Sequence, residues 1–396
     1  MATSILILAL VAVLAPLGAR AVAPWLRVPI VVFELVLGIV VGPSVLGLVE
    51  PSEFLERLSD FGLAVLFFVA GTEIDFAGIR GRPVRRALFG WVASIVLGVG
   101  IGLLIVPGEG AVIVAVALAS TALGTLVPIL RDAGEMTTPF GRAVSAIGAV
   151  GEFAPLVAIS VFLGGREPGA ATVVLLIFVV IAGAGIVLAL RMPHGKIHAF
   201  VRSTLHTSGQ FAVRIVILIL AGLVALSIVL DIDMLIGAFA AGIIWRIMMR
   251  EAPEVDREQV ESKIEAVAFG LLVPVFFIMT GVTFDLAALF AQPLLLALVP
   301  AFLVALLITR GVPALWAAPE GSGFRDRAAL GLFASTGLPI IVAVTAIGVD
   351  EELISSGLAA TLVAAGMLSV LLFPLTAMAL RGKSTVPASI PVGDDA

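Results

Sequence analysis

Apolar runs of about twenty residues recur from one end of this sequence to the other, and they limit what the chain can fold into. An α-helix needs about 20 apolar residues to cross the hydrocarbon core of a bilayer, so such runs are typical of membrane-spanning helices. The composition agrees, because 61% of the 396 residues are hydrophobic and only 13% are charged. The sequence therefore predicts an all-α, multispanning membrane protein and excludes a soluble globular domain.

Charged and Pro/Gly-rich breaks divide the chain into thirteen predicted spans. They lie near 4–20, 29–48, 61–79, 86–106, 111–131, 142–164, 170–190, 211–230, 234–250, 265–284, 293–316, 327–348 and 355–380. With the N-terminus outside, only Arg57 and Arg166 of the 23 Arg and Lys residues fall on the outer side, as the positive-inside rule requires. We therefore expect a transmembrane domain over 1–382, N-terminus out and C-terminus in, followed by a short disordered cytoplasmic tail over 383–396.

Two pairs of segments resemble each other across the chain. LFFVAGTEIDF (66–76) is similar to VFFIMTGVTFDL (275–286), and ALASTALGTLVPIL (117–130) is similar to GLFASTGLPII (331–341). The members of each pair are seven spans apart, and an odd offset means that they cross the membrane in opposite directions. This pattern predicts an inverted-topology repeat. Its units are 1–164 and 211–380, and the span at 170–190 joins them.

The second pair of segments also shares helix breakers. Each has Ala-Ser-Thr, then a glycine (Gly124 or Gly337) and a proline (Pro128 or Pro339). Glycine weakens a helix, proline removes a backbone donor, and nearby hydroxyl groups can bond to the freed carbonyl groups. Interrupted helices at matching places in two repeats are a sequence pointer to an ion site at the midplane. The alternative is that these residues only kink two continuous helices.

One carboxylate, Glu152, lies near the middle of the predicted span at 142–164. An ionised side chain at this depth costs several kcal/mol, so it is rare unless it is functional or paired. The neighbouring Gly151 is small enough to let another segment approach. We expect Glu152 to exchange a proton for a cation, and the alternative is a structural partner for a hydroxyl group or an arginine.

Each of the remaining charged residues near the spans has two interpretations, one functional and one structural. Glu73 and Asp75 lie toward the inner end of their span, about a turn from Arg80 and Arg82, where an interfacial ion pair competes with a role in transport. Glu34 lies near the inner end of its span, seven residues after Arg27, and has the same two interpretations. Arg310 follows a long apolar run, and it either reaches Glu152 or extends to the inner surface. His194 and His198 lie four residues apart in a polar linker, where a solvated loop is favoured over a metal site.

Several function classes find no support in the sequence. It has no cysteine, no phosphate-binding loop, no nucleotide fingerprint and no serine–histidine pair within the spans. We therefore expect no enzyme activity, no cofactor, no metal beyond a transported cation, and no nucleic-acid partner.

These motifs, in this order, resemble the cation:proton antiporter 2 family of sodium/hydrogen exchangers. The resemblance runs over essentially the whole chain through RVPIVVFELVLGIVVGPSVLGLV, FFVAGTEIDF, ALASTALGTLVP, GEFAPL and VPVFFIMTGVTFDL. It implies thirteen spans, a homodimer in the inner or plasma membrane of a prokaryotic cell, and two crossed broken helices with elevator-like alternating access. It also implies ion and proton binding by Glu152, Ser120, Thr121 and Thr125, with Ser335, Thr336 and Gly337 in the second broken helix.

The sequence departs from that family's pattern at two places. Members that exchange unequal charge have two adjacent acids, whereas here Gly151 precedes Glu152. The lysine that those members carry before the second break has no clean match, and Arg310 is the nearest basic residue. Both departures favour an electroneutral exchange of Na⁺ or K⁺ for H⁺. Sodium-coupled uptake of an organic anion and a cation channel stay open as alternatives.

Overall fold

The computed structural model describes residues 2–23, 28–74, 82–163, 166–191, 210–250 and 253–381, and these residues form helices and no strand. The helices up to the linker are α1 (Ala2–Val22), α2 (Ile30–Val41), α3 (Glu53–Thr72), α4 (Arg82–Ile105), α5 (Gly110–Leu118), α6 (Leu123–Asp132), α7 (Pro139–Phe162) and α8 (Pro168–Arg191). Those after it are α10 (Phe211–Val229), α11 (Met234–Met248), α12 (Glu254–Val267), η1 (Ala268–Leu272), α13 (Val273–Val282), α14 (Leu286–Ala291), α15 (Pro293–Leu306), η2 (Leu307–Gly311), α16 (Val312–Ala314), η3 (Leu315–Ala317), α17 (Phe324–Ala334), α18 (Pro339–Asp350) and α19 (Ser356–Arg381).

The prediction of an all-helical membrane protein is confirmed. In the described chain, ten helical segments are long and apolar enough to cross a membrane, and α2 and α11 are shorter apolar helices. Each of the thirteen predicted segments contains helix, but the count of thirteen crossings and the orientation stay predictions. The predicted tail, the two linker histidines and Asp75 lie outside the described residues.

Several helix boundaries differ from the sequence prediction, among them the start of the helix before α13, which begins at Glu254 rather than near residue 265. α3 begins at Glu53, eight residues before the expected start, because its first turns are amphipathic and carry exposed acidic residues that a division at charges excludes. α2 ends at Val41, where Gly42 takes an extended conformation and starts a turn, so the expected span at 29–48 is part helix and part turn.

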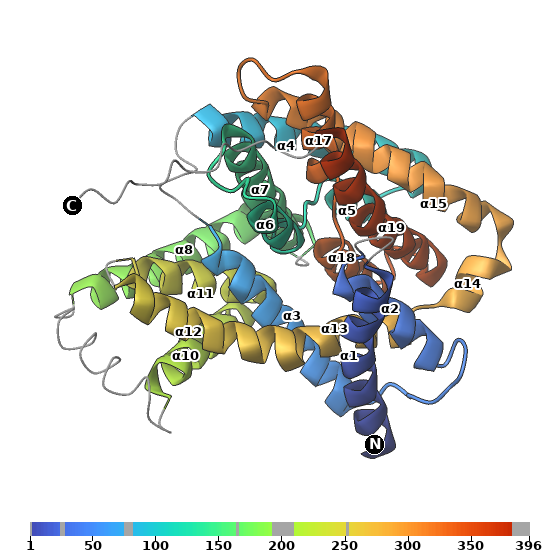
Figure 1. Cartoon of the computed structure of the whole chain (residues 1–396), viewed down its shortest axis with the longest axis horizontal. Coiled ribbons are helices and arrows are strands. Elements are labelled where there is room, and N and C mark those ends of the chain that lie inside the picture. The colour runs from blue at the N-terminus through green and yellow to red at the C-terminus, as the bar shows by residue number, and fades with distance from the viewer. Residues whose placement is uncertain are drawn as a thin grey trace, which may run out of the picture.

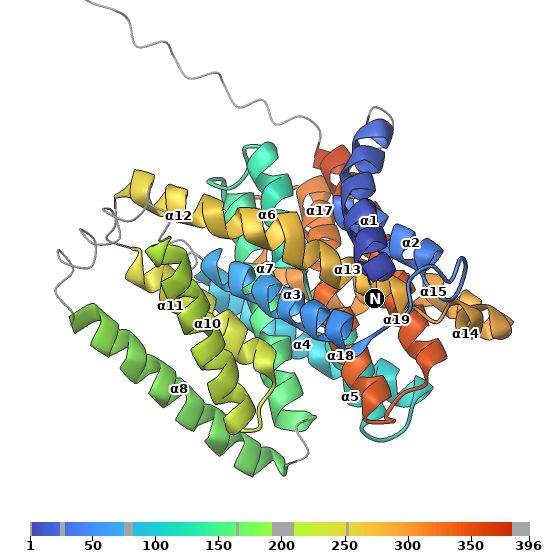
Figure 2. The ribbon, with the colours of Figure 1, turned by 90° about the horizontal axis from the view of Figure 1, so that it is seen from below.

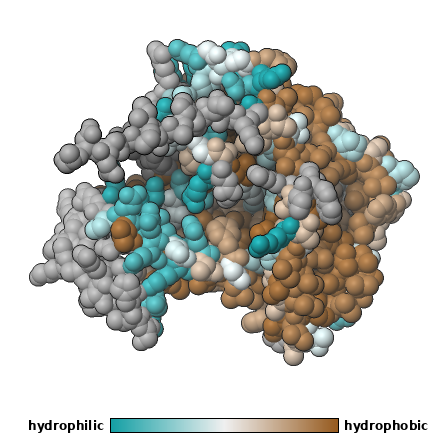
Figure 3. Space-filling model, in the orientation of Figure 1, coloured by the Kyte–Doolittle hydropathy of each residue, from teal (hydrophilic) through white to brown (hydrophobic). Residues whose placement is uncertain are grey.

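The helices pack in two bundles (Figure 1). In the first, α3 packs on α11 and α13, while α2 packs on α13 and α1, and α10 packs on α11. In the second, α4 packs on α5 and α7, and α19 packs on α15, α17 and α18. α8 contacts both α7 and α11, and Figure 2 shows it along the outside of the molecule. The surface is apolar over α1, α2 and α15 and hydrophilic over α12 (Figure 3).

Backbone-to-backbone contacts at glycines tie the first bundle together. α2 crosses α13 at Gly38 and Gly281, and α3 crosses α11 at Gly71 and Gly242. A Cβ atom on any of the four would meet a backbone carbonyl oxygen of the partner helix. Gly71 and Gly281 hold the same place in the two similar motifs, so the two crossings are equivalent. This equivalence supports the repeat read from the sequence.

Candidate functional site

Both predicted helix interruptions are present in the second bundle. α5 and α6 are separated by residues 119–122, and α17 and α18 by residues 335–338. At each break a hydroxyl group bonds back to a carbonyl oxygen of the last helical turn: Ser120 Oγ donates to Ala117 O at 2.8 Å, and Ser335 Oγ donates to Gly331 O at 2.8 Å. Pro339, which has no backbone N–H, is the first residue of α18. Gly337 lies in the second break as expected, whereas Gly124 and Pro128, the expected breakers of the first helix, lie inside α6 just after its break.

The two interruptions contact each other directly. The backbone N–H of Ala122 donates to the carbonyl oxygen of Thr336 at 2.8 Å, and Thr121 Oγ1 donates to Ala334 O at 2.6 Å. The backbone N–H of Thr121 also donates to Gly151 O, on α7, at 2.9 Å. α7 is therefore attached to the crossing at the residue before Glu152.

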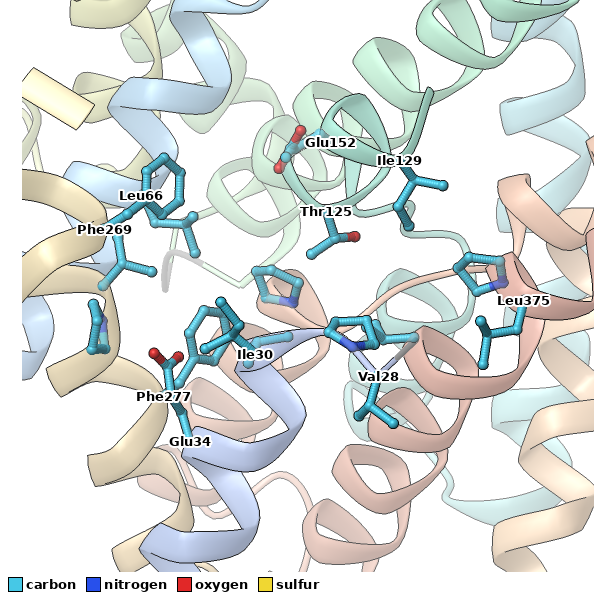
Figure 4. A pocket seen from close by; sticks show the side chains of 18 of the residues that line it. Val28, Ile30, Glu34, Leu66, Thr125, Ile129, Glu152, Phe269, Phe277 and Leu375 are labelled. Atoms are coloured by element: carbon cyan, nitrogen blue, oxygen red, sulfur yellow. The ribbon is translucent and has the colours of Figure 1, made fainter. Parts of the chain in front are cut away.

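Glu152 lies beside this crossing, with 2% of its surface exposed. Its carboxyl group interacts with the backbone N–H of Leu123, the first residue of α6. Its Oε2 atom is buried and has no hydrogen-bond partner. Glu152 also lines a cavity of about 930 Å³, shared with Thr125, and Figure 4 shows both side chains on its wall. A carboxyl group that lines a cavity and has one buried oxygen without a partner can bind either a proton or a cation.

Arg310 reaches the core, so the alternative that it extends to the inner surface is wrong. Its side chain is 0% exposed on the π-helix η2, where it donates from Nε to Thr121 Oγ1 and from Nη2 to Ile147 O, both at 2.8 Å. Its Nη1 atom is buried without a partner. Within the described chain no ion pair joins Arg310 to Glu152, because Arg310 lies behind Gly151 while Glu152 faces the cavity.

The partial charges of the helix ends at the crossing are opposite in sign to the side chains of Arg310 and Glu152 that lie beside them. α5 and α17 end there, and the C-terminus of a helix carries a partial negative charge. Arg310 bonds to Thr121, whose hydroxyl group bonds the last residue of α17, and the adjacent Thr309 donates to Leu118 O at the end of α5. α6 begins there, and its partially positive N-terminus faces Glu152. The crossing therefore holds one fixed positive and one ionisable negative group at ends of opposite sign.

Of the other predicted site residues, one lines the cavity and the rest form hydrogen bonds that hold the second interrupted helix. Thr125 lines the cavity and donates to Ala122 O at 2.9 Å. Ser335 and Thr336 are 0% exposed, and their hydroxyl groups donate to carbonyl oxygens in the last turn of α17. The backbone of Gly337 is held on both sides by Ser369 Oγ of α19, at 3.2 and 3.1 Å, a residue that the sequence reading missed because a lone serine in an apolar run carries no signal.

Glu73 lies at the C-terminal end of α3 and is not in a described ion pair. Its Oε2 atom is buried without a hydrogen-bond partner, and its charge acts electrostatically on Glu152. Arg80, one of its expected partners, lies outside the described residues. Glu73 thus lies close enough to interact electrostatically with Glu152 and with Arg131 of α6. No group of three or more His, Asp or Glu in the described chain could hold a metal ion.

Gly151 provides a sharp test of this packing. A Cβ atom there would meet Arg310 Nη2, and it would lie 2.6 Å from Thr121 Oγ1. We expect Gly151→Ala to displace Arg310 or the first interruption and to lower the transport rate about 100-fold, as misplacement by about 1 Å typically does. Gly222→Ala on α10 is the control, because nothing lies within 4 Å of its Cβ position, and its rate should match wild type. Equal rates for both variants would contradict this packing.

Comparisons with known proteins agree with the geometry. A family model described as "Sodium/hydrogen exchanger, transmembrane" matches residues 9–380. A protein of Bacillus subtilis named putative Na⁺/H⁺ antiporter YjbQ is 26% identical over 91% of this chain and 60% of its own length. The Na⁺/H⁺-K⁺ antiporter GerN of Bacillus cereus is 33% identical over 65% of this chain and 66% of its own length.

A solved structure has a similar fold. The sodium proton antiporter MjNhaP1 of Methanocaldococcus jannaschii superposes with a TM-score of 0.67 and 18% identity, covering 94% of this chain and 96% of that protein. At this identity the likeness concerns the fold alone. The chain spans 60% and 66% of the lengths of the two Bacillus relatives.

Proposed function

This chain belongs to the sodium/hydrogen exchanger family, and from that premise we propose that it exchanges a monovalent cation, Na⁺ or K⁺, for a proton at Glu152. It is a multi-pass membrane protein of a transporter family and not an enzyme. The observation that carries the proposal is a single, unpaired, buried carboxyl group at the end of a cavity and beside two crossed helix interruptions. The name of the relative from Bacillus cereus includes K⁺, which supports keeping both cations.

The exchange follows from the surroundings of Glu152. A carboxylate buried in apolar surroundings needs a neutralising partner, because the bare charge is costly. The described structure provides no arginine or lysine for it. A proton and a cation therefore compete for one group, and the loaded forms are both neutral. Thr125, whose side chain also lines the cavity, would supply a further oxygen ligand for a cation.

Electroneutral exchange is the second part of the proposal. Glycine stands at position 151, where a second acid would add a second exchangeable charge, and Arg310 Nη2 occupies the neighbouring space. An arginine keeps its proton over the physiological range. One carboxyl group that alternates between one proton and one cation moves no net charge per cycle.

Alternating access by an elevator-like motion is the third part. The cavity that contains Glu152 is lined by the N-terminal end of α2 and the C-terminal end of α19. A second cavity of about 540 Å³, lined by Glu56, Asp60 and Asp350 near the other ends of the helices, does not include Glu152. Phe153 of α7 stacks on Phe239 of α11, with 5.4 Å between ring centroids, on the face of α7 next to Glu152. We propose that the second bundle moves against the first, in a homodimer with thirteen spans per chain.

The test is reconstitution of the full chain in liposomes that contain a pH-sensitive dye. Addition of Na⁺ or K⁺ is expected to move protons in the opposite direction, with the same rate whether or not a membrane voltage is imposed. Strong voltage dependence would contradict one-for-one exchange, and cation flux without proton movement would contradict exchange itself. The cavity could also admit an organic anion, but none of the described residues that line it is basic, so an anion would find no positive partner there.

A further inference from the structure

A second carboxyl group, Glu34 of α2, lines the same cavity as Glu152. Figure 4 shows the two groups on different parts of the wall, Glu34 from the first bundle and Glu152 from the second. The Glu34 residue is 6% exposed, among apolar neighbours that include Ile30 and Phe277. The proposed exchange at Glu152 makes no use of this buried acid.

No described residue neutralises Glu34. Within the part of the chain that the structure describes, no hydrogen bond or ion pair to its side chain is present, and its oxygens are not sealed from the cavity. The helices packed on α2 are α1, α13 and α19. α13 has no charged residue, Arg20 of α1 is exposed, and Arg381 of α19 is paired with Glu135 at 2.8 Å. Arg27, the expected partner on its own segment, lies outside the described residues.

A nearly buried carboxylate without a partner is costly in apolar surroundings, so it binds a proton or a cation from the cavity. The same reasoning applied to Glu152. Because both groups face one cavity, an ion that leaves one can reach the other without crossing a protein barrier. The two groups lie on bundles that move apart in the proposed cycle, so Glu34 would meet Glu152 only when the cavity is open.

We propose that Glu34 is a second binding group for the transported cation and the proton, and that it exchanges the two with Glu152. The step is balanced: a cation on the Glu152 carboxylate and a proton on Glu34 become a proton on Glu152 and a cation on the Glu34 carboxylate. No net charge enters or leaves the cavity, which is compatible with electroneutral exchange. The direction of this step depends on the proposed function, whereas binding at Glu34 does not.

The first experiment uses Glu34→Gln, which has the shape of the protonated acid but cannot bind a cation. In everted membrane vesicles, we expect the apparent KM for the cation on the cavity side to rise about tenfold, because a carboxylate in a cleft concentrates cations. Glu34→Asp keeps the charge and should recover most of the affinity. Glu53→Gln removes the same charge from an exposed position and should leave KM unchanged. An unchanged KM in Glu34→Gln would overturn the proposal.

The second experiment detects binding without transport. In infrared difference spectra of the purified protein, the carboxylic acid band should contain a component that Na⁺ removes and that is absent from Glu34→Gln. This component should persist in Glu152→Gln, so that failure of exchange and failure of binding at Glu34 are distinguished. If the Glu34 band appears only after Arg27→Gln, then Glu34 is held in an ion pair with Arg27 and the proposal is wrong.

Discussion

Glu152→Gln is expected to insert and fold as the wild-type chain does and to exchange no cation for protons. Glutamine matches the protonated acid in shape, so the interaction with the Leu123 N–H is kept at the oxygen. It cannot bind a cation electrostatically or release a proton. Since we find one exchangeable group at the crossing, the rate should fall to that of empty liposomes.

The measurement is cation-driven proton movement in liposomes of matched protein content. Thermal unfolding of the purified variant shows whether it folds, and Glu109→Gln, an exposed loop acid, controls for the loss of one negative charge. Removal of an unpaired buried carboxylate should leave the unfolding temperature unchanged or raise it. A Glu152→Gln variant that still collapses a pH gradient on addition of Na⁺ or K⁺ would show that the site lies elsewhere.

Arg310→Met is expected to lower both stability and transport. The variant loses the bonds to Thr121 Oγ1 and Ile147 O, and it leaves two helix C-termini without a facing positive charge. Loss of two hydrogen bonds from a charged donor costs about 3 kcal/mol, part of which is offset because a buried charge is removed. We expect the unfolding temperature to fall by about 5 °C and the exchange rate to fall about 100-fold.

Arg310→Lys separates charge from geometry. Lysine keeps the positive charge but has no planar fork to reach both oxygens. We expect it to recover much of the stability and little of the rate, because the side-chain link from Thr121 Oγ1 to Ile147 O of α7 is lost and only the backbone bond from Thr121 to Gly151 still joins the crossing to α7. Full transport by Arg310→Met would mean that the two interruptions keep their positions without this side chain, which contradicts the role assigned to it.

Much of the fold could be predicted from the sequence because its signals are local. Each apolar run is long enough to identify a helix without its neighbours, and Ser, Thr, Gly and Pro together mark both interruptions. Glu152 was identified in the same way, because a carboxylate in an apolar run is conspicuous. These predictions needed no knowledge of which helices touch.

The parts that could not be predicted depend on contacts between helices. The depth of Arg310 is decided by η2, where an i→i+5 bonding pattern changes the register of the helix, and by the space that Gly151 leaves. A run of apolar residues before an arginine is equally compatible with either depth. The same holds for Glu34, because its place on the cavity wall depends on how α2 packs on α13 and α19, which a single span does not reveal.

The cavity itself has a consequence for ion selection. About 930 Å³ is room for roughly thirty water molecules, so a cation can travel through it with its hydration shell intact. If the exchange takes place at Glu152 as proposed, Na⁺ and K⁺ would be distinguished at the last step, where oxygens of Glu152 and Thr125 would replace part of that shell. Selectivity would then depend on the number and spacing of a few oxygen atoms at the crossing. Substitutions elsewhere on the cavity wall would change the local cation concentration but not the preference for Na⁺ or K⁺.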